Sequence, residues 1–135
     1  MSTAMRISQA LVDDMVAHAR ADNPHECCGL VSRRDGEAVK VYRTTNTEAS
    51  QFRFVIDPAE QLRIYNEIED AGLDLGAIYH SHTRSEPYPS QTDINFAKDW
   101  PGVLWIIVGL ANGDPEVRTY EIRDGQVVDA ELEIL

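Results

Sequence analysis

The sequence predicts an α/β (α+β) fold in which a mixed central β-sheet is flanked by helices. Apolar runs of strand length alternate along the chain with segments whose apolar residues recur at helical spacing. Two Asp-Gly pairs, at residues 35–36 and 124–125, each separate two strand-like runs and are typical of hairpin turns. Together these patterns favour a layered arrangement of helices on a sheet.

Local signals predict the elements of the first half of the chain. Ser8 precedes apolar residues at helical spacing, which predicts a first helix that ends before Pro24. Asp57 and Pro58 have the residue types of an N-cap and a first turn, and they predict a second helix that Gly72 ends. Strands are expected at residues 28–32, 38–42 and 52–56.

The second half of the chain is predicted in the same way. Residues 76–82 begin with an apolar run that indicates a central strand, and a polar loop follows. Ser90 then begins a further helix. The remaining strands are expected at residues 103–110, 117–122 and 127–132, the last two pairing across the second Asp-Gly turn.

Length and charge limit the possible functions. A chain of 135 residues is an ordinary length for one compact domain, here residues 1–135. Its 43% hydrophobic and 26% charged residues are typical of a globular protein with a real core. The formal net charge of −11 repels nucleic-acid phosphates and anionic membrane surfaces, so we expect neither as a partner. The acidity is equally consistent with a saline habitat or a basic partner.

Targeting signals and cysteines indicate a cytoplasmic location. No apolar run reaches the roughly 18 residues of a membrane span, and the N-terminus lacks the pattern of a signal peptide. The two cysteines, Cys27 and Cys28, are adjacent and cannot link distant segments, which favours reduced thiols. His18 and His25 have no partner at ligand spacing, so we expect surface or capping roles for both.

The residues with the clearest potential for catalysis or metal binding lie between positions 80 and 93. His80 and His82 point to the same face of their predicted strand, because side chains two residues apart do so. Asp93, in the first turn of the next helix, can complete a set of two histidines and one aspartate. Three protein ligands leave one position of a Zn²⁺ ion open for water, which is typical of a hydrolytic site. The pattern therefore predicts a zinc hydrolase.

Two further residues are open to more than one interpretation. Ser90 and Asp93 have the spacing of a helix N-terminus, so Ser90 can act as a cap, present a donor to an oxyanion, or do both. A hydrolase also needs a carboxylate for proton transfer. Spacing alone does not single out Glu26, because it is one of 23 acidic residues.

The segment from Glu26 to Leu30, together with His80-Ser81-His82, Ser90 and Asp93, resembles the JAMM (MPN-plus) metalloprotease family. The resemblance covers nearly the whole chain and implies the MPN/JAMM architecture, which is similar to that of cytidine deaminases. It also implies that His80, His82 and Asp93 bind zinc and that Ser90 lies near the oxyanion. By the same resemblance, Glu26 is the general acid and base.

Within that family the chain is most similar to small bacterial members of Mec type, in length and in residues 79–83 and 88–90. This likeness implies cleavage after the Gly-Gly tail of a ubiquitin-like sulfur-carrier protein, with release of cysteine. Thr83 stands where many members have proline, which modestly favours this branch. A deubiquitinase-like isopeptidase of broader specificity and a non-catalytic MPN scaffold remain alternatives. The oligomeric state is not indicated.

Overall fold

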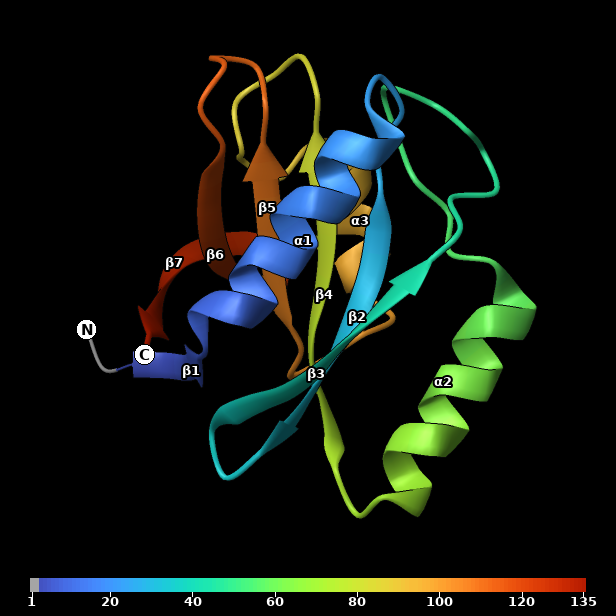
Figure 1. Ribbon diagram of the computed structural model, residues 1–135, viewed down its shortest axis with the longest axis vertical. Helices are drawn as coiled ribbons and strands as arrows, with labels where there is room; N and C mark the ends of the chain where they lie inside the picture. The colour runs from blue at the N-terminus through green and yellow to red at the C-terminus, as the bar shows by residue number, and fades with distance from the viewer. Residues whose placement is uncertain (1–2) are drawn as a thin grey trace.

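The computed structural model describes residues 3–135, which form three helices and seven strands (Figure 1). None of the helices in this part of the chain combines the length and apolar character needed to cross a membrane. The helices are α1 (Gln9–Asp22), α2 (Pro58–Asp70) and α3 (Gln91–Ala97). The strands are β1 (Thr3–Ile7), β2 (Cys28–Arg34), β3 (Glu37–Thr44), β4 (Asp74–His82), β5 (Leu104–Gly109), β6 (Glu116–Arg123) and β7 (Gln126–Ile134).

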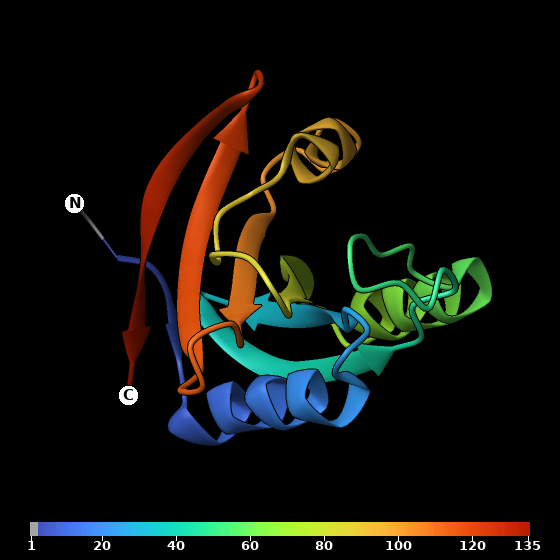
Figure 2. The ribbon, with the colours of Figure 1, turned by 90° about the horizontal axis from the view of Figure 1, so that it is seen from above.

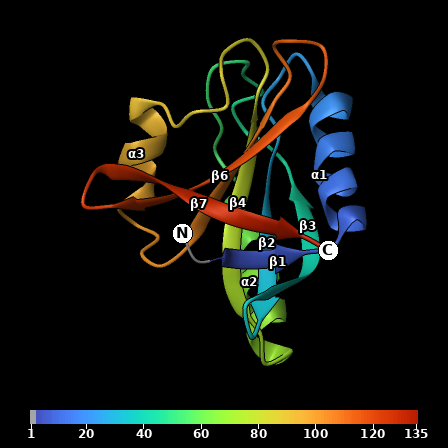
Figure 3. The same cartoon turned by 90° about the vertical axis from the view of Figure 1, so that its left-hand side faces the viewer.

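The strands form one mixed sheet that closes on itself in the order β1-β3-β2-β4-β5-β6-β7. β4 lies between β2, to which it is antiparallel, and β5, to which it is parallel, so its predicted central position is confirmed. β1 closes the ring: it runs parallel to β7 and meets β3 at a single pair, Arg6 and Glu37 (Figure 3). The mixed sheet and both predicted hairpins are confirmed.

Two features of the sheet differ from the prediction. Residues 52–56 do not form a strand, because the side chain of Asn46 takes up their backbone groups: its Nδ2 donates to Arg53 O and its Oδ1 accepts from Val55 N. One isolated bridge, between Asn46 and Ile56, is the remaining strand-like contact. The short strand β1 was not expected, since five residues are too few for a clear alternating pattern.

The helices cover the two faces of the sheet. Figure 2 shows α1 on one face, with α2 and α3 on the opposite side. Two apolar clusters fill the spaces between, and β4 contributes to both: Ala77 and Tyr79 belong to the cluster beneath α1, and Ile78 to the cluster beneath α2 and α3. Because residues alternate along the strand, His80 and His82 face the side of α3.

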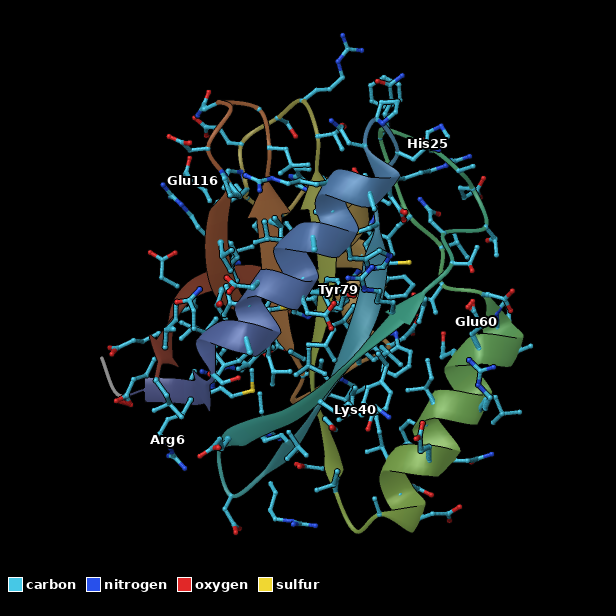
Figure 4. All side chains as sticks on the ribbon, viewed as in Figure 1. Arg6, His25, Lys40, Glu60, Tyr79 and Glu116 are labelled. Atoms are coloured by element: carbon cyan, nitrogen blue, oxygen red, sulfur yellow. The ribbon has the colours of Figure 1, made fainter. Side chains whose placement is uncertain are left out.

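The cluster beneath α1 depends on a close approach between Tyr79 and Gly29, which are paired across β4 and β2. The ring of Tyr79 lies where a side chain on residue 29 would stand, only 2.2 Å from an ideal Cβ. Its hydroxyl is 2.7 Å from His18 Nδ1, and His18 Nε2 is 3.3 Å from Asp22 (Figure 4 places Tyr79 beside α1). The expected surface role of His18 is therefore wrong, because this residue is buried between α1 and the sheet.

We expect Gly29→Ala to lower the free energy of unfolding by about 1–3 kcal/mol, because the added methyl group overlaps the Tyr79 ring. Chemical denaturation of the two proteins measures this difference. Tyr79→Leu is the matched second change, since a smaller side chain relieves the overlap. The double variant should lose less than the sum of the two single losses, and simple additivity would contradict the proposed clash.

Candidate metal centre

Three polar side chains meet at the end of β4, where the loops that precede β2, α2 and α3 also gather (Figure 1). Figure 4 shows His25, which lies in the first of these loops, at this end of the molecule. His80 and His82 lie in the last three residues of β4, and their side chains point to the same face of the sheet. Asp93 reaches them from the first turn of α3.

The distances among these three side chains fit a metal ion. His80 Nε2 and His82 Nε2 lie 3.2 Å apart, and Asp93 Oδ2 lies 3.1 Å from the first nitrogen and 3.2 Å from the second. A tetrahedral Zn²⁺ ion with bonds of about 2.0–2.1 Å separates its ligand atoms by about 3.3 Å. The two imidazoles and the carboxylate therefore have the donor types and the spacing of a zinc site.

Asp93 is held in place by the start of its own helix. Its backbone N–H donates to Ser90 Oγ (3.1 Å), and the Ser90 N–H donates to Asp93 Oδ2 (3.0 Å), which together form a capping box. Burial alone would raise the pKa of Asp93, but the adjacent His80 and His82 and the Ser90 N–H hold it well below its ordinary value. The carboxylate is therefore charged and aimed at both imidazoles.

His82 is oriented by the loop that follows it. Its Nδ1 lies 2.8 Å from the carbonyl oxygen of Glu86, so this nitrogen donates to the loop and Nε2 is the nitrogen that faces the centre. The next residue, Pro87, packs on Gly109, where a Cβ would come within 3.0 Å of the proline ring. Tyr120 from β6 donates its hydroxyl to the Pro87 carbonyl at 2.6 Å. Neither Gly109 nor Tyr120 was predicted from the sequence as part of the site.

His80 is oriented by packing. Its ring stacks on Phe54 at a centroid distance of 4.5 Å and meets the edge of Trp105 at 6.5 Å. Its Nδ1 is buried and has no hydrogen-bond partner among residues 3–135. Burial lowers the pKa of His80, and the nearby Asp93 only partly offsets this effect, so the neutral imidazole that binds a metal is favoured.

Glu26 approaches the same point from the loop before β2. Its backbone is fixed on both sides: the N–H donates to Ser50 O (2.7 Å) and the carbonyl accepts from Asn46 Nδ2 (3.0 Å). Glu26, His80 and His82 are buried, and their ligand-type atoms lie within 4.8 Å of one another. Glu26 Oε1 has no hydrogen-bond partner in the described part of the chain. A buried, unpaired carboxylate oxygen of this kind calls for a partner from outside the protein.

The two carboxylates of the site differ in environment. Asp93 contacts both imidazole nitrogens, whereas Glu26 contacts neither and stands back from them. Burial raises the pKa of Glu26 to about 7, His82 opposes this rise and Asp93 adds to it. Asp93 is thus suited to bind a cation, and Glu26 to exchange a proton near neutral pH.

All five residues selected from the sequence lie at this end of the molecule. The structure brings together His80, His82 and Asp93, with Glu26 beside them. Ser90 caps α3, as one of its two interpretations expected, and its hydroxyl oxygen accepts from Asp93. Its contact with an oxyanion stays a prediction.

The fold and this site define a JAB-type domain. The sequence model described as prokaryotic homologs of the JAB domain matches residues 8–123, and the chain belongs to that family. The JAMM resemblance of the sequence is thereby confirmed, together with the fold that it implied.

Named relatives and a solved structure are similar over most of the chain. The CysO-cysteine peptidase of Mycobacterium tuberculosis is 38% identical over 130 residues, which cover 93% of this chain and 87% of the relative. The desampylase of Haloferax volcanii is 37% identical over 114 residues, covering 78% and 81% of the two chains. The solution structure of the protein DSY2949 from Desulfitobacterium hafniense superposes with a TM-score of 0.84 at 30% identity, covering 97% of this chain and 92% of that one.

The raised pKa of Glu26 predicts a pH-dependent effect on stability. The folded protein holds the Glu26 proton more tightly than the unfolded chain does, in which the pKa of Glu26 has its ordinary value of 4.5. The contribution of the Glu26 proton to the free energy of unfolding is fully present below about pH 4.5. It is lost as the pH rises through the folded-state pKa of about 7. In chelator-treated protein, Glu26→Gln should therefore gain stability relative to wild type across this window, by on the order of 1–3 kcal/mol.

Denaturant titrations of the two chelated proteins at several pH values measure this difference. The other titrating groups are shared, so they cancel when the two curves are subtracted. A difference that stays constant between about pH 4.5 and pH 8 would contradict the burial of an ionisable Glu26 in the folded protein.

Proposed function

We propose that this protein is a zinc-dependent peptidase that cuts after the C-terminal Gly-Gly tail of a ubiquitin-like sulfur-carrier protein and releases cysteine. In this proposal His80, His82 and Asp93 hold the zinc ion, Glu26 transfers protons, and Ser90 assists the oxyanion. The observation that carries it is the meeting of three ligand atoms at 3.1–3.2 Å beside an unpaired, buried carboxylate.

The donor set supports zinc as the metal. Two imidazole nitrogens and one carboxylate oxygen form a three-ligand set that leaves a fourth tetrahedral position open, as in hydrolytic zinc sites. When bound there, the ion supplies Lewis acidity that polarises the scissile carbonyl and lowers the pKa of water. The Glu86 carbonyl behind His82 and the capping box around Asp93 fix the directions of two of the three ligands.

Glu26 performs the proton transfers of the proposed reaction. Its carboxylate takes a proton from the attacking water as the oxygen of that water bonds to the carbonyl carbon of the terminal glycine. The same proton then passes to the leaving nitrogen as the carbon–nitrogen bond breaks. In the metal-free protein, burial raises the pKa of Glu26 to about 7, which suits a carboxylate that takes a proton and returns it. The Ser90 hydroxyl keeps a proton that it can donate to the oxyanion, because its oxygen acts as an acceptor in the cap.

The relatives support the substrate class. The Mycobacterium tuberculosis relative is named for cleavage of CysO-cysteine, and the similarity extends over 93% of this chain. The short loops around the centre also leave little structure for gripping a long conjugate chain: residues 83–90 contain no helix or strand. The likeness to this relative therefore favours release of a single amino acid from a carrier tail.

The proposal predicts that carrier ending in Gly-Gly-Cys is cleaved and that chelation stops the reaction. Glu26→Gln should retain zinc but lose about a hundredfold to ten thousandfold in kcat, as expected for loss of a general acid and base. Elemental analysis should find zinc in wild type and in Glu26→Gln, and much less in His82→Ala. Glu86→Gln is the matched control, because only the backbone carbonyl of Glu86 contacts the site.

A side-by-side assay with lysine-linked ubiquitin-like conjugates separates the alternatives. Faster cleavage of lysine-linked conjugates would replace the sulfur-carrier substrate with a broader isopeptidase activity. Zinc binding without cleavage of either substrate would support a scaffold role and refute the proposed peptidase. Full activity of Glu26→Gln would remove Glu26 from the mechanism.

A further inference from the structure

We propose that Arg84 binds the α-carboxylate of the residue released by the peptidase, and that it thereby selects a single C-terminal amino acid as the leaving group. This inference rests on the proposed function, and it adds a specificity residue that neither the sequence motif nor the metal site identifies. Three observations carry it: the side of the site on which Arg84 lies, the state of its charge, and the chemistry of the leaving group.

Arg84 lies on the Glu26 side of the metal centre. Its neighbour Thr83 donates its hydroxyl to the carbonyl oxygen of Pro24 at 3.1 Å. Pro24 is two residues before Glu26 in the same loop, so this bond joins the end of β4 to the segment that presents the proton-transferring carboxylate. Thr83 thus gives the chain after His82 a fixed path beside Glu26.

The guanidinium group of Arg84 is also tied to this side. Its NH1 donates to Gln51 Oε1 at 3.1 Å, across the gap between two loops. Gln51 follows Ser50, whose carbonyl accepts the Glu26 N–H at 2.7 Å. The two contacts of the Thr83-Arg84 pair therefore reach the loop that contains Glu26 and the segment that accepts the Glu26 N–H. The leaving nitrogen receives its proton from Glu26, so the leaving group departs on this same side.

The charge of Arg84 is available for a ligand. No carboxylate of residues 3–135 lies within ion-pair distance of its guanidinium group, whose hydrogen-bond partner Gln51 is neutral. Arg53 on the facing loop differs, because it pairs with Glu48 at 3.5 Å. The formal net charge of the chain is −11, so an anionic leaving group meets repulsion unless a local cation offsets it.

The leaving group of the proposed reaction carries the anion that fits this position. A released amino acid has a carboxylate on the carbon next to its amine, so the charged oxygens are three bonds from the nitrogen that Glu26 protonates. A guanidinium group binds such a carboxylate through two parallel hydrogen bonds. A lysine-linked conjugate carries no carboxylate at this distance from its nitrogen, and Arg84 would not aid its cleavage.

The test compares two carriers that both end in Gly-Gly-Cys, one with a free C-terminal carboxylate and one with a C-terminal carboxamide. For wild type we expect kcat/KM to be higher on the free acid, and Arg84→Gln should lower that value about tenfold to a hundredfold. The same substitution should leave cleavage of the amide almost unchanged. Arg53→Gln is the matched control, because it removes an exposed arginine of the facing loop that is already paired.

A binding measurement gives a second readout that does not depend on turnover. In the Glu26→Gln background, calorimetry should show that Arg84→Gln weakens binding of the free acid and not of the amide. Equal losses on both substrates, or no loss on either, would overturn the role of Arg84. If wild type cleaves neither carrier, the proposed function is refuted instead. This result differs from the results that would overturn the role of Arg84 alone.

Discussion

The candidate metal centre depends on one oxygen atom, Asp93 Oδ2, which accepts the Ser90 N–H and lies within 3.2 Å of both imidazole nitrogens. This hydrogen bond is part of the capping box at the start of α3, and it also orients the Asp93 carboxylate toward the histidines. β4 supplies the other half of the geometry, because His80 and His82 share a face through the strand repeat of two. Two regular elements therefore bring three ligands together without an unusual backbone conformation.

Burial gives the two carboxylates of the centre opposite properties. Asp93 is surrounded by imidazoles and an N–H group, which keep it charged, whereas burial raises the pKa of Glu26, whose Oε1 has no hydrogen-bond partner among residues 3–135. The hydrogen bonds from Glu26 N–H to Ser50 O and from Asn46 Nδ2 to Glu26 O fix the Glu26 backbone beside the two histidines. The two carboxylates lie close together in the structure, although they come from distant parts of the chain.

Much of the fold and of the candidate metal site could be predicted from local patterns. The histidine pair, the capping signature at Ser90 and the hairpins each have a period or spacing that a single segment displays. Features that depend on contacts between distant segments could not be read in this way. Examples are the backbone role of Asn46 that replaces a strand, the burial of His18 against Tyr79, and the support of Pro87 by Tyr120. The position of Glu26 came from family resemblance alone, because nothing in its neighbourhood distinguishes it from other acids.

The closure of the sheet by β1 has a consequence for self-association. β1 pairs with β7 along most of its length but with β3 through one pair, Arg6 and Glu37. Loss of this five-residue strand would leave backbone donors and acceptors of β7 without partners, and such edges recruit strands from other molecules. Proteolysis near the first residues is therefore expected to favour strand exchange between copies and aggregation, while the candidate metal site at the far end of β4 stays intact.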